Sequence, residues 1–458
     1  MKTKEVQSKG PQEKKSSANM TEGPIAKSIL MFAIPIFIGQ LLQQLYNMAD
    51  AWVIGNFADN DAFAAVSSAG SVTMLIVGLF NGISVGGGVI ISKYYGAGDK
   101  EKIVKAIHTN FLFGIIASVL STVIGLLCVP TILKFMNIPE SVLPNSLSYF
   151  RIYFAGVSTV IMYNICMSIM RALGDSVHPL YYLMFSSVVN VVLDLLFVAV
   201  FHWGVAGAGI ATVIAQGMSV VFCIVKMCRS KEYTRLDFRK LRFEKEIMLE
   251  VIKQGLPTGI QSSVISIGNL TVQSNINSFG SFAMAGVGAY SKIEGFVFLP
   301  IVSMSMALPT YISQNLGAHK YDRAKKGGVF GILFGVITAE IFGVLIYINA
   351  PTLLRIFVDT TESVAYGMIH VRVTALFFCL LAFTHCCAGV LRGCGKAFIP
   401  MITMLAFWCG VRVIYVTSIL KVIPEFQMIS WAYPLTWSLS SIVLFIILRK
   451  LDWTKTFK

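Results

Sequence analysis

Two acidic residues lie in apolar parts of this sequence, where charged side chains are otherwise rare. Asp50 closes a polar stretch that begins at Gln43, and Asp194 follows Asn190 by four residues. A charge inside a bilayer costs a few kcal/mol on insertion scales, so such an acid is expected to face a wet cavity or to bind an ion. Two of them in the same half of the chain indicate an ion-coupled transporter.

The first acid belongs to a polar stripe. Four residues spaced by three, one and three positions share one helix face: Gln43, Tyr46, Asn47 and Asp50. Neither Lys nor Arg lies within one helical turn of Asp50. Burial disfavours a lone carboxylate anion, so Asp50 is predicted to take up a proton or to bind Na⁺. The alternative is a hydrogen-bonded Asp that only holds helices together.

The second acid has neighbours that carry oxygen. Asn190 and Asp194 share a helix face, and Thr212 lies in the next apolar segment. Carboxylate, amide and hydroxyl oxygens are ligands of hard cations. The sequence therefore predicts a Na⁺ or H⁺ site at Asp50, Asn190 and Asp194, with Thr212 completing its shell. Alternatively, the Thr212 hydroxyl bonds back to its own helix.

The chain contains two copies of one unit. Arg171-Ala-Leu-Gly174 recurs as Arg392-Gly-Cys-Gly395 after 221 residues, and Gly96-Ala97 recurs as Gly317-Ala318 at the same spacing. One spacing shared by separate features indicates a duplication.

The second copy keeps polar groups but not the acids. Thr271 or Val272 matches Asp50, and Tyr415 matches Asp194. Cation coupling is therefore predicted in the N-terminal half. Neutral polar residues from both halves are predicted to line a substrate cavity: Gln43, Tyr46, Asn47, Gln261, Asn269 and Gln273.

Four further charged residues lie in apolar segments of the second half: Lys292, Glu294, Glu340 and Arg412. We expect a buried pair among them that clamps helices together, and substrate binding is the alternative. His385 is predicted to be a hydrogen-bonded core residue.

Pro35 lies inside the first apolar segment, about four turns before Asp50, and Pro257 is its counterpart in the second copy. Proline removes one backbone hydrogen bond and can kink a helix. Pro35 is therefore predicted to be a hinge, with a static kink as the alternative.

Composition indicates an all-α membrane protein. The 458 residues are 55% hydrophobic and 13% charged, with a mean hydropathy of +0.72, whereas about 25% of the residues in a soluble protein are charged. A helix needs roughly 20 apolar residues to cross a bilayer. We predict twelve such spans, at 25–52, 62–92, 105–130, 146–171, 180–201, 205–228, 248–277, 283–313, 328–350, 365–391, 399–421 and 429–449.

Lys and Arg gather in alternate loops, which follows the positive-inside rule and places both termini in the cytoplasm. The net charge of +14 is thus a topology signal, and no nucleic-acid partner is predicted. Six spans in each copy give two six-helix bundles of the same orientation, related by a pseudo-twofold axis along the membrane normal.

The predicted organisation has five parts. Residues 1–23 are predicted to be a disordered cytoplasmic tail, followed by an N-lobe of helices 1–6 at 24–229 and a cytoplasmic linker at 230–247. A C-lobe of helices 7–12 at 248–450 and a cytoplasmic C-terminal tail at 451–458 complete the chain. The nine cysteines show no zinc-binding spacing, and no cofactor is predicted beside the coupling ion.

These features together resemble a bacterial MATE (multidrug and toxic compound extrusion) transporter over about residues 24 to 450. The resemblance rests on the duplicated halves, Pro35, the stretch from Gln43 to Asp50, Gly96-Ala97-Gly98-Asp99, Arg171-Ala-Leu-Gly174-Asp175 and Asn190-x-x-x-Asp194. It implies a V-shaped pair of six-helix bundles that exports organic, often cationic, compounds in exchange for H⁺ or Na⁺.

The resemblance also implies where the cation binds. In the DinF-like branch the site lies in the N-lobe and would fall on Asp50, Asn190, Asp194 and Thr212, with bending of the first helix at Pro35. The NorM-like branch uses acids in the seventh and tenth helices, but residues 257–277 and 373–391 contain no Asp or Glu. The N-lobe site is therefore favoured.

The sequence thus predicts a monomeric multidrug antiporter of the cytoplasmic (inner) membrane. One alternative is a lipid-linked oligosaccharide flippase, which would need several basic groups in its central cleft, where only Lys292 and Arg412 are candidates. A membrane-embedded enzyme is the distant alternative, because the six histidines are scattered and neither HExxH nor GxSxG occurs.

Overall fold

The computed structural model describes residues 20–57, 60–136, 142–230 and 232–457, and no strand occurs among them. Residues 1–19, most of the predicted N-terminal tail, lie outside this range. The described helices are α1 (Ile25–Phe57), α2 (Asn60–Ala97), α3 (Lys100–Phe135), α4 (Leu143–Ala172), α5 (Val177–Asp194), α6 (Gly204–Cys228), α7 (Lys245–Asn277), α8 (Ser281–Gly317), α9 (Tyr321–Arg355), α10 (Thr361–Thr374), α11 (Phe378–Gly393), α12 (Phe398–Met404), α13 (Arg412–Val422) and α14 (Phe426–Arg449).

Short stretches of other helix types join some of these elements into longer rods. The π-helix η1 (Leu195–Val200) continues α5, the 3₁₀ turn η4 (Ala375–Phe377) joins α10 to α11, and the π-helix η5 (Leu405–Val411) joins α12 to α13. Within the described residues this gives twelve helical rods, each overlapping one of the twelve predicted spans. Ten of them are long and apolar enough to cross a membrane, and α2 and α7 are the other two. The predicted all-α membrane fold is confirmed.

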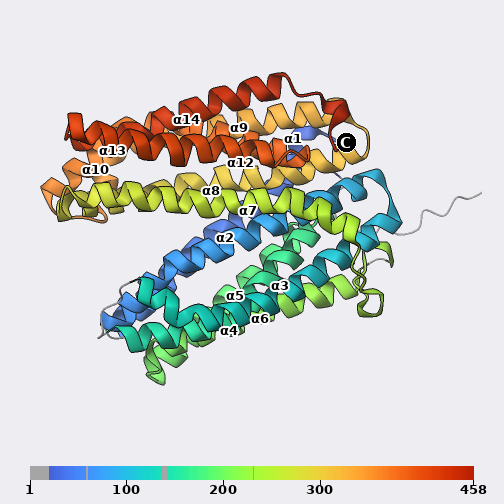
Figure 1. The fold of residues 1–458 in the computed structure, drawn as a ribbon, viewed down its shortest axis with the longest axis horizontal. Coiled ribbons are helices and arrows are strands. Elements are labelled where there is room, and N and C mark those ends of the chain that lie inside the picture. Colours follow the sequence, from blue (N-terminus) through green and yellow to red (C-terminus); the bar gives the residue numbers. More distant parts are fainter. Residues whose placement is uncertain (1–19, 58–59, 137–141, 231, 458) are drawn as a thin grey trace, which may run out of the picture.

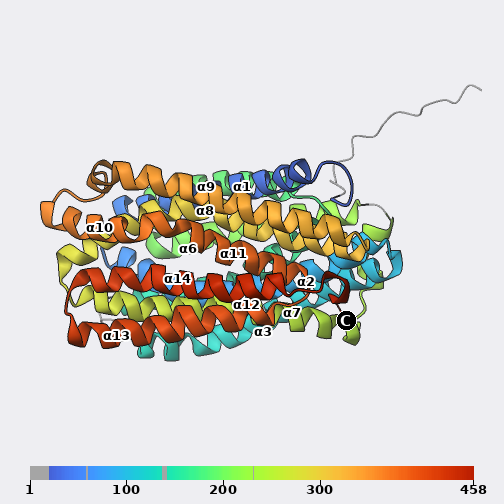
Figure 2. The ribbon, with the colours of Figure 1, turned by 90° about the horizontal axis from the view of Figure 1, so that it is seen from above.

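The rods form two bundles. Helices α2–α6 make up one bundle and α7–α14 the other; the two approach at the end that carries the C terminus and diverge toward the opposite end (Figure 1). The view from above shows the long helices running nearly side by side (Figure 2). We call the α1–α6 half the N-lobe and the α7–α14 half the C-lobe.

The repeated Arg-x-x-Gly motif ends a helix in each lobe. Gly174 follows α4 and Gly395 follows α11, with φ of 86° and 76°. In this left-handed conformation the next backbone N–H reaches the last turn: Asp175 N donates to Met170 O at 3.0 Å, and the equivalent bond to Leu391 O is 2.9 Å. Glycine adopts this conformation without the steric penalty of a Cβ atom, which explains its recurrence in the motif.

Helix α1 packs against both lobes. Its first turns contribute Ile29, Phe32 and Ile36 to a buried cluster with α8, whereas Val53 and Ile54 near its end pack against Val198 and Ala208 of the N-lobe. Pro35 lies where the first set of contacts ends. Pro35, the predicted hinge, thus lies between the part of α1 that packs on the C-lobe and the part that packs on the N-lobe.

Helix α7 repeats this behaviour in the opposite sense. Its residues Ile247, Met248 and Val251 belong to the core of the N-lobe, and Val272 and Ile276 belong to a cluster of the C-lobe. The start of each of these two helices thus crosses into the other half of the molecule.

Glycines let the lobes approach closely where they meet. A Cβ at Gly96 would overlap the Gln314 carbonyl, and a Cβ at Gly317 would overlap the Lys93 carbonyl. Both partners are 221 residues apart, so the two contacts are equivalent under the repeat. Gly82 and Gly86 of α2 meet α7 in the same way. Contacts through small residues allow this close helix crossing.

The structure corrects one boundary. Residues 20–23, assigned to the disordered tail from sequence, pack on the C-lobe. Met20 is fully buried, and Arg323 donates hydrogen bonds to the carbonyls of Met20, Glu22 and Gly23. The Arg323 guanidinium holds this segment through its backbone carbonyls, and amino-acid composition carries no information about such bonds.

Candidate cation-coupling site

Three elements of the N-lobe bring the predicted cation-site residues together. Asp50 comes from α1, Asn190 and Asp194 from α5, and Thr212 from α6. Packing of Val53 and Ile54 against η1 and α6 fixes the end of α1 at this depth.

Asp194 is the last residue of α5, and the π-helix η1 begins directly after it. The wider turn is visible in a backbone bond from Phe201 N to Leu196 O at 2.9 Å, five residues apart. Stretches of π-helix inside α-helices occur frequently at functional sites. The sequence gave no signal for this local change of helix type.

The two acids face each other inside the lobe. Asp194 is fully buried, Asp50 is half-buried, and their carboxyl groups lie close enough to interact through a shared proton. A hydrogen bond between two carboxyl groups requires a proton on one of them, because two carboxylates have only acceptors. Loss of the shared proton would leave two carboxylates that repel each other, so the protonation state of the pair is linked to this contact.

Asn190 orients the second acid. With its amide placed so that both ends find partners, its nitrogen donates to Asp194 Oδ2 at 2.8 Å and its oxygen accepts from Thr212 N at 3.2 Å. This orientation is assigned from the hydrogen bonds. It leaves the amide nitrogen, not an oxygen, against the carboxylate.

The Thr212 hydroxyl has one hydrogen bond to its own helix and lies near the Tyr46 hydroxyl. It donates to the Ala208 carbonyl at 3.0 Å, which is the alternative considered for it from sequence. Asp50 Oδ1 and Asp194 Oδ1, in contrast, are buried without a hydrogen-bond partner among the described residues. These two oxygens are the open coordination positions of the site.

Sequence analysis missed two tyrosines beside the acids. Tyr149 and Tyr153 of α4 stack on each other with ring centroids 6.3 Å apart, and Tyr149 lies within electrostatic range of Asp50, Asp194 and Tyr46. Their spacing of four residues on one helix face is a signal that could have identified them.

The residues predicted to line a substrate cavity occupy different environments. Asn47 is exposed, while Gln43 and Tyr46 are half-buried. Gln261 is buried inside the C-lobe, where its amide nitrogen contacts Met404 Sδ at 2.7 Å. Asn269 and Gln273 are exposed on α7. Gln261 is therefore buried, whereas the other five residues are exposed or half-buried.

The four charged residues named for the C-lobe do not lie together in the structure. Glu294 and Arg412 interact electrostatically. Glu340 instead accepts from Cys379 N at 3.1 Å at the start of α11, and Lys292 is exposed with its ammonium over the Phe357 ring. Sequence gives the depth of a residue along a helix but not reliably the side it faces.

Arg412 is held by neutral hydrogen-bond partners and aromatic rings. Its guanidinium donates to Thr436 Oγ1 at 2.9 and 3.2 Å and to Asn269 Oδ1 at 3.4 Å, and it lies over the rings of Tyr433 and Trp408. His385 is half-buried; its buried Nε2 has no described partner, and its ring packs against aromatic rings instead.

No group of three or more His, Cys, Asp or Glu side chains among the described residues is placed to hold a metal ion. The acids of the N-lobe are thus a pair, completed by neutral oxygen and nitrogen groups.

Comparison with known proteins decides the family. The MatE family profile matches residues 35–196 and residues 257–416, once in each lobe. The chain belongs to the MatE family. The two matched segments also coincide with the duplication seen in the sequence.

MatE relatives of this chain span most of its length. It is 25% identical over 391 residues to the probable multidrug resistance protein YpnP of Bacillus subtilis, which covers 85% of this chain and 87% of the relative. It is 28% identical over 395 residues to YoeA of the same organism, with 84% and 85% covered. The multidrug export protein MepA of Staphylococcus saprophyticus is 23% identical, with 87% of each chain covered.

Solved structures share the MatE fold. A MATE family transporter of the MOP superfamily in an outward-facing conformation superposes with a TM-score of 0.88 at 21% identity, covering 96% of this chain and 98% of that one. A MATE in the straight conformation gives 0.87 at 22% identity, covering 95% and 97%. At these identities the likeness shows the fold, which includes two bundles and many membrane helices.

Proposed function

We propose that this MatE protein is a secondary active exporter of small organic, mainly cationic compounds, driven by inward movement of a coupling cation. The family and the names of its relatives, which are multidrug resistance and export proteins, support this function. We place it as a monomer in the cytoplasmic membrane with both termini in the cytoplasm, because Lys and Arg concentrate in the loops on that side.

The observation that carries the proposal is the pair of neighbouring acids, half-buried Asp50 and fully buried Asp194, which has no cationic side chain among its described partners. Export that uses an ion gradient needs a group whose charge changes during the cycle. An acid pair that shares one proton supplies such a group, whereas a permanent ion pair does not.

We propose H⁺ as the coupling ion. Na⁺ would require several oxygen ligands, and Asp50 Oδ1, Asp194 Oδ1 and Thr212 Oγ1 could supply three. Asn190, however, presents its amide nitrogen to Asp194, so it would have to rotate before it could bind a cation. A proton needs only the contact that the two carboxyl groups already make.

The two-lobe attachment of α1 suggests how protonation reaches the rest of the molecule. The first turns of α1 are fixed to the C-lobe and its end to the N-lobe, with Pro35 between them. In this proposal, loss of the Asp50–Asp194 contact releases the end of α1, and the helix adjusts at Pro35 because proline leaves one backbone carbonyl without its helical partner. This is the DinF-like scheme that the resemblance implies.

The same site explains a preference for cationic compounds. A deprotonated acid attracts a cation, and Tyr46, Tyr149 and Tyr153 offer aromatic faces beside it, on which cations also bind. Proton and substrate then compete for the same carboxyl groups, which makes their transport in opposite directions obligatory.

The flippase alternative would need a group of cations facing a common cavity. Lys292 and Arg412 do not provide it, because Lys292 is exposed beside Phe357 and Arg412 is 2% exposed and bonded to Thr436. No described observation favours this function over drug export.

Export of a fluorescent cationic dye from cells tests the proposal. Cells with the wild type should export the dye, and cells with Asp50→Asn should retain it; a protonophore should abolish wild-type export, whereas removal of Na⁺ should leave it intact. Glu425→Gln, at an exposed acid, is the matched control. Equal export by wild type and Asp50→Asn would refute coupling through Asp50 and direct attention to Glu294 and Glu340.

A further inference from the structure

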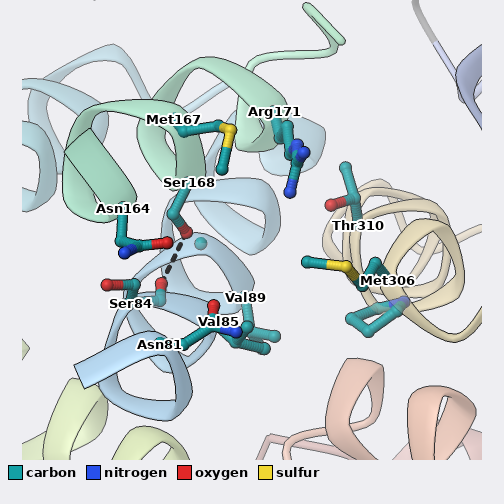
Figure 3. A pocket seen from close by; sticks show the side chains of 12 residues that line it. Asn81, Ser84, Val85, Val89, Asn164, Met167, Ser168, Arg171, Met306 and Thr310 are labelled. Carbon is teal, nitrogen blue, oxygen red and sulfur yellow. Dashed lines mark hydrogen bonds between the residues drawn. The ribbon is translucent and has the colours of Figure 1, made fainter. Parts of the chain in front are cut away.

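A second feature of the molecule lies between the lobes, on the side where they meet. A small open hollow there is lined by α2, α4 and α8 (Figure 3). The Arg171 side chain extends toward it from α4, and Met306 and Thr310 face it from α8 of the other lobe. The coupling mechanism above uses none of these residues.

The repeat offers an internal reference for Arg171. Its counterpart in the C-lobe is Arg392, which donates to Ser305 Oγ at 3.0 Å and to the Ala388 carbonyl at 3.2 Å. Ser84 stands in the N-lobe at the position of Ser305, 221 residues earlier, and also lines the hollow. The same Arg and Ser therefore occur in both lobes, and in the C-lobe they are bonded to each other.

In the N-lobe the equivalent bond is not made. Ser84 donates to the Phe80 carbonyl of its own helix, and Arg171 Nε is buried with no hydrogen-bond partner in the described part of the chain. Within the described residues Arg171 makes no salt bridge: the nearby acid Asp175 is engaged with His178, whose Nδ1 lies 2.7 Å from it. Arg171 is half-buried, and burial of an unpaired guanidinium nitrogen costs free energy, so the fold retains a cation here that its own described residues do not neutralise.

The lining fits a small organic anion. Among the described lining residues none is Asp or Glu, while Asn81, Asn164 and Thr310 add uncharged polar groups. Met167 and Met306 add flexible apolar surface on opposite sides. Guanidinium groups recognise carboxylates through two parallel N–H···O bonds, and an apolar body suits the methionines.

We propose that this hollow is a binding site for the carboxylate of a small, partly apolar organic anion, with Arg171 as its anchor. Because the wall is shared by α4 of the N-lobe and α8 of the C-lobe, a bound anion contacts both lobes where they meet. The inference concerns binding and does not depend on the identity of the coupling ion or on export of cationic dyes.

Equilibrium binding to the purified full-length protein tests it, with benzoate as the probe and the neutral, similarly shaped benzamide as its control. Wild type should bind benzoate saturably and benzamide at least tenfold more weakly. Arg171→Gln should lose benzoate binding by a similar factor, and Arg171→Lys should retain part of it, since an ammonium keeps the charge but not the paired bonds. Lys292→Gln, which removes an exposed cation elsewhere, should bind as wild type does.

A second variant protects the test against misfolding of Arg171→Gln. Met306→Trp fills the hollow from the other lobe with Arg171 intact, so it should also abolish benzoate binding. Absence of saturable benzoate binding to wild type, or equal binding by wild type and both variants, would overturn the proposal. Displacement of benzoate by inorganic phosphate at lower concentration than by benzoate itself would overturn the assignment to a carboxylate. Dye export by Arg171→Gln is measured in parallel, so that failure of the anion-site proposal can be told apart from failure of the exporter proposal.

Discussion

The two lobes place opposite charges in comparable helices. In the N-lobe, α1 and α5 contribute Asp50 and Asp194, and no cation is among their described hydrogen-bond partners. In the C-lobe, the matching rods are α7 and the α12–α13 rod, and the buried charge is Arg412. A π-helix adjoins the charged residue in each case, after Asp194 and before Arg412.

The difference lies in how completely each charge is satisfied. Arg412 has hydrogen bonds to Thr436 and Asn269, aromatic rings on its faces and Glu294 within electrostatic range. The acid pair keeps two buried oxygens without partners. A fully bonded guanidinium stays charged and stabilises the helices around it, whereas a partly bonded acid pair can exchange a proton. The same arrangement of helices thus holds a fixed, bonded charge in the C-lobe and an acid pair that can exchange a proton in the N-lobe.

The largest effect is expected from removing the acids. Asp50→Asn and Asp194→Asn should each reduce dye export to that of cells without the protein, because an amide cannot carry the proton. Both variants should remain folded, since an amide can still hydrogen-bond a carboxyl group. Dye retention, with the amount of protein in the membrane measured in parallel, checks this. Export by Asp194→Asn at the wild-type rate would show that Asp194 of the N-lobe is not needed for coupling.

Arg412→Gln should act on stability instead of coupling. Loss of hydrogen bonds from a buried charged donor should lower the free energy of unfolding by about 2–3 kcal/mol. The same change at the exposed Arg355 should have little effect. Thermal unfolding in detergent measures both.

The double variant Arg412→Gln with Glu294→Gln sharpens this result. Its destabilisation should be smaller than the sum of the two single effects, because removal of one charge leaves the other uncompensated. Additive effects would show that Glu294 and Arg412 do not interact, and loss of proton dependence in Arg412→Gln would show that the C-lobe takes part in coupling.

Gly96→Ala and Gly317→Ala test whether the lobes are equivalent where they meet. Each Cβ would overlap a carbonyl of the other lobe, so each variant should destabilise this closed arrangement by about 1–3 kcal/mol, and by similar amounts. Gly288→Ala is the control, since a Cβ there meets open space. A shift in the unfolding temperature of only one of the two interface variants would contradict the symmetric crossing.

The smallest effects are expected at the prolines. Pro35 is half-buried, whereas Pro257 is buried between Gly255 and Gly259, which pack against α2. Pro35→Ala should slow dye export several-fold because it restores a backbone bond in the helix that carries Asp50. Pro257→Ala should change export less, since its helix is already fixed. Initial rates of dye export, measured at equal expression, test this difference. Slower export by Pro257→Ala than by Pro35→Ala would favour a static kink at Pro35.

The sequence was sufficient for the fold because a bilayer permits few solutions. Each span must be apolar and long enough to cross, and the repeat spacing fixed how the halves correspond. The residues of the acid site were also predictable, since Asn190 and Asp194 share a helix face and Asp50 ends a polar stripe. Their roles remain predictions.

Other features depend on which side of its helix a residue faces and on which residues it contacts, and neither can be read from residue spacing. Lys292 and Glu294 are two residues apart but lie in different environments, and Gln261 faces into the C-lobe although it belongs to the same helix as Asn269. The Arg171 and Arg392 motifs look alike in sequence, and only the structure shows that one is bonded and the other is not.

Transport by purified protein in liposomes tests the central claim most directly. Dye movement is measured under an imposed proton gradient, then under a Na⁺ gradient alone, for wild type, for Asp50→Asn with Asp194→Asn, and for Glu294→Gln. Wild type and Glu294→Gln should respond to the proton gradient and not to Na⁺, and the double N-lobe variant should respond to neither. A proton response that survives in the double N-lobe variant but disappears in Glu294→Gln would contradict the account and place coupling in the C-lobe.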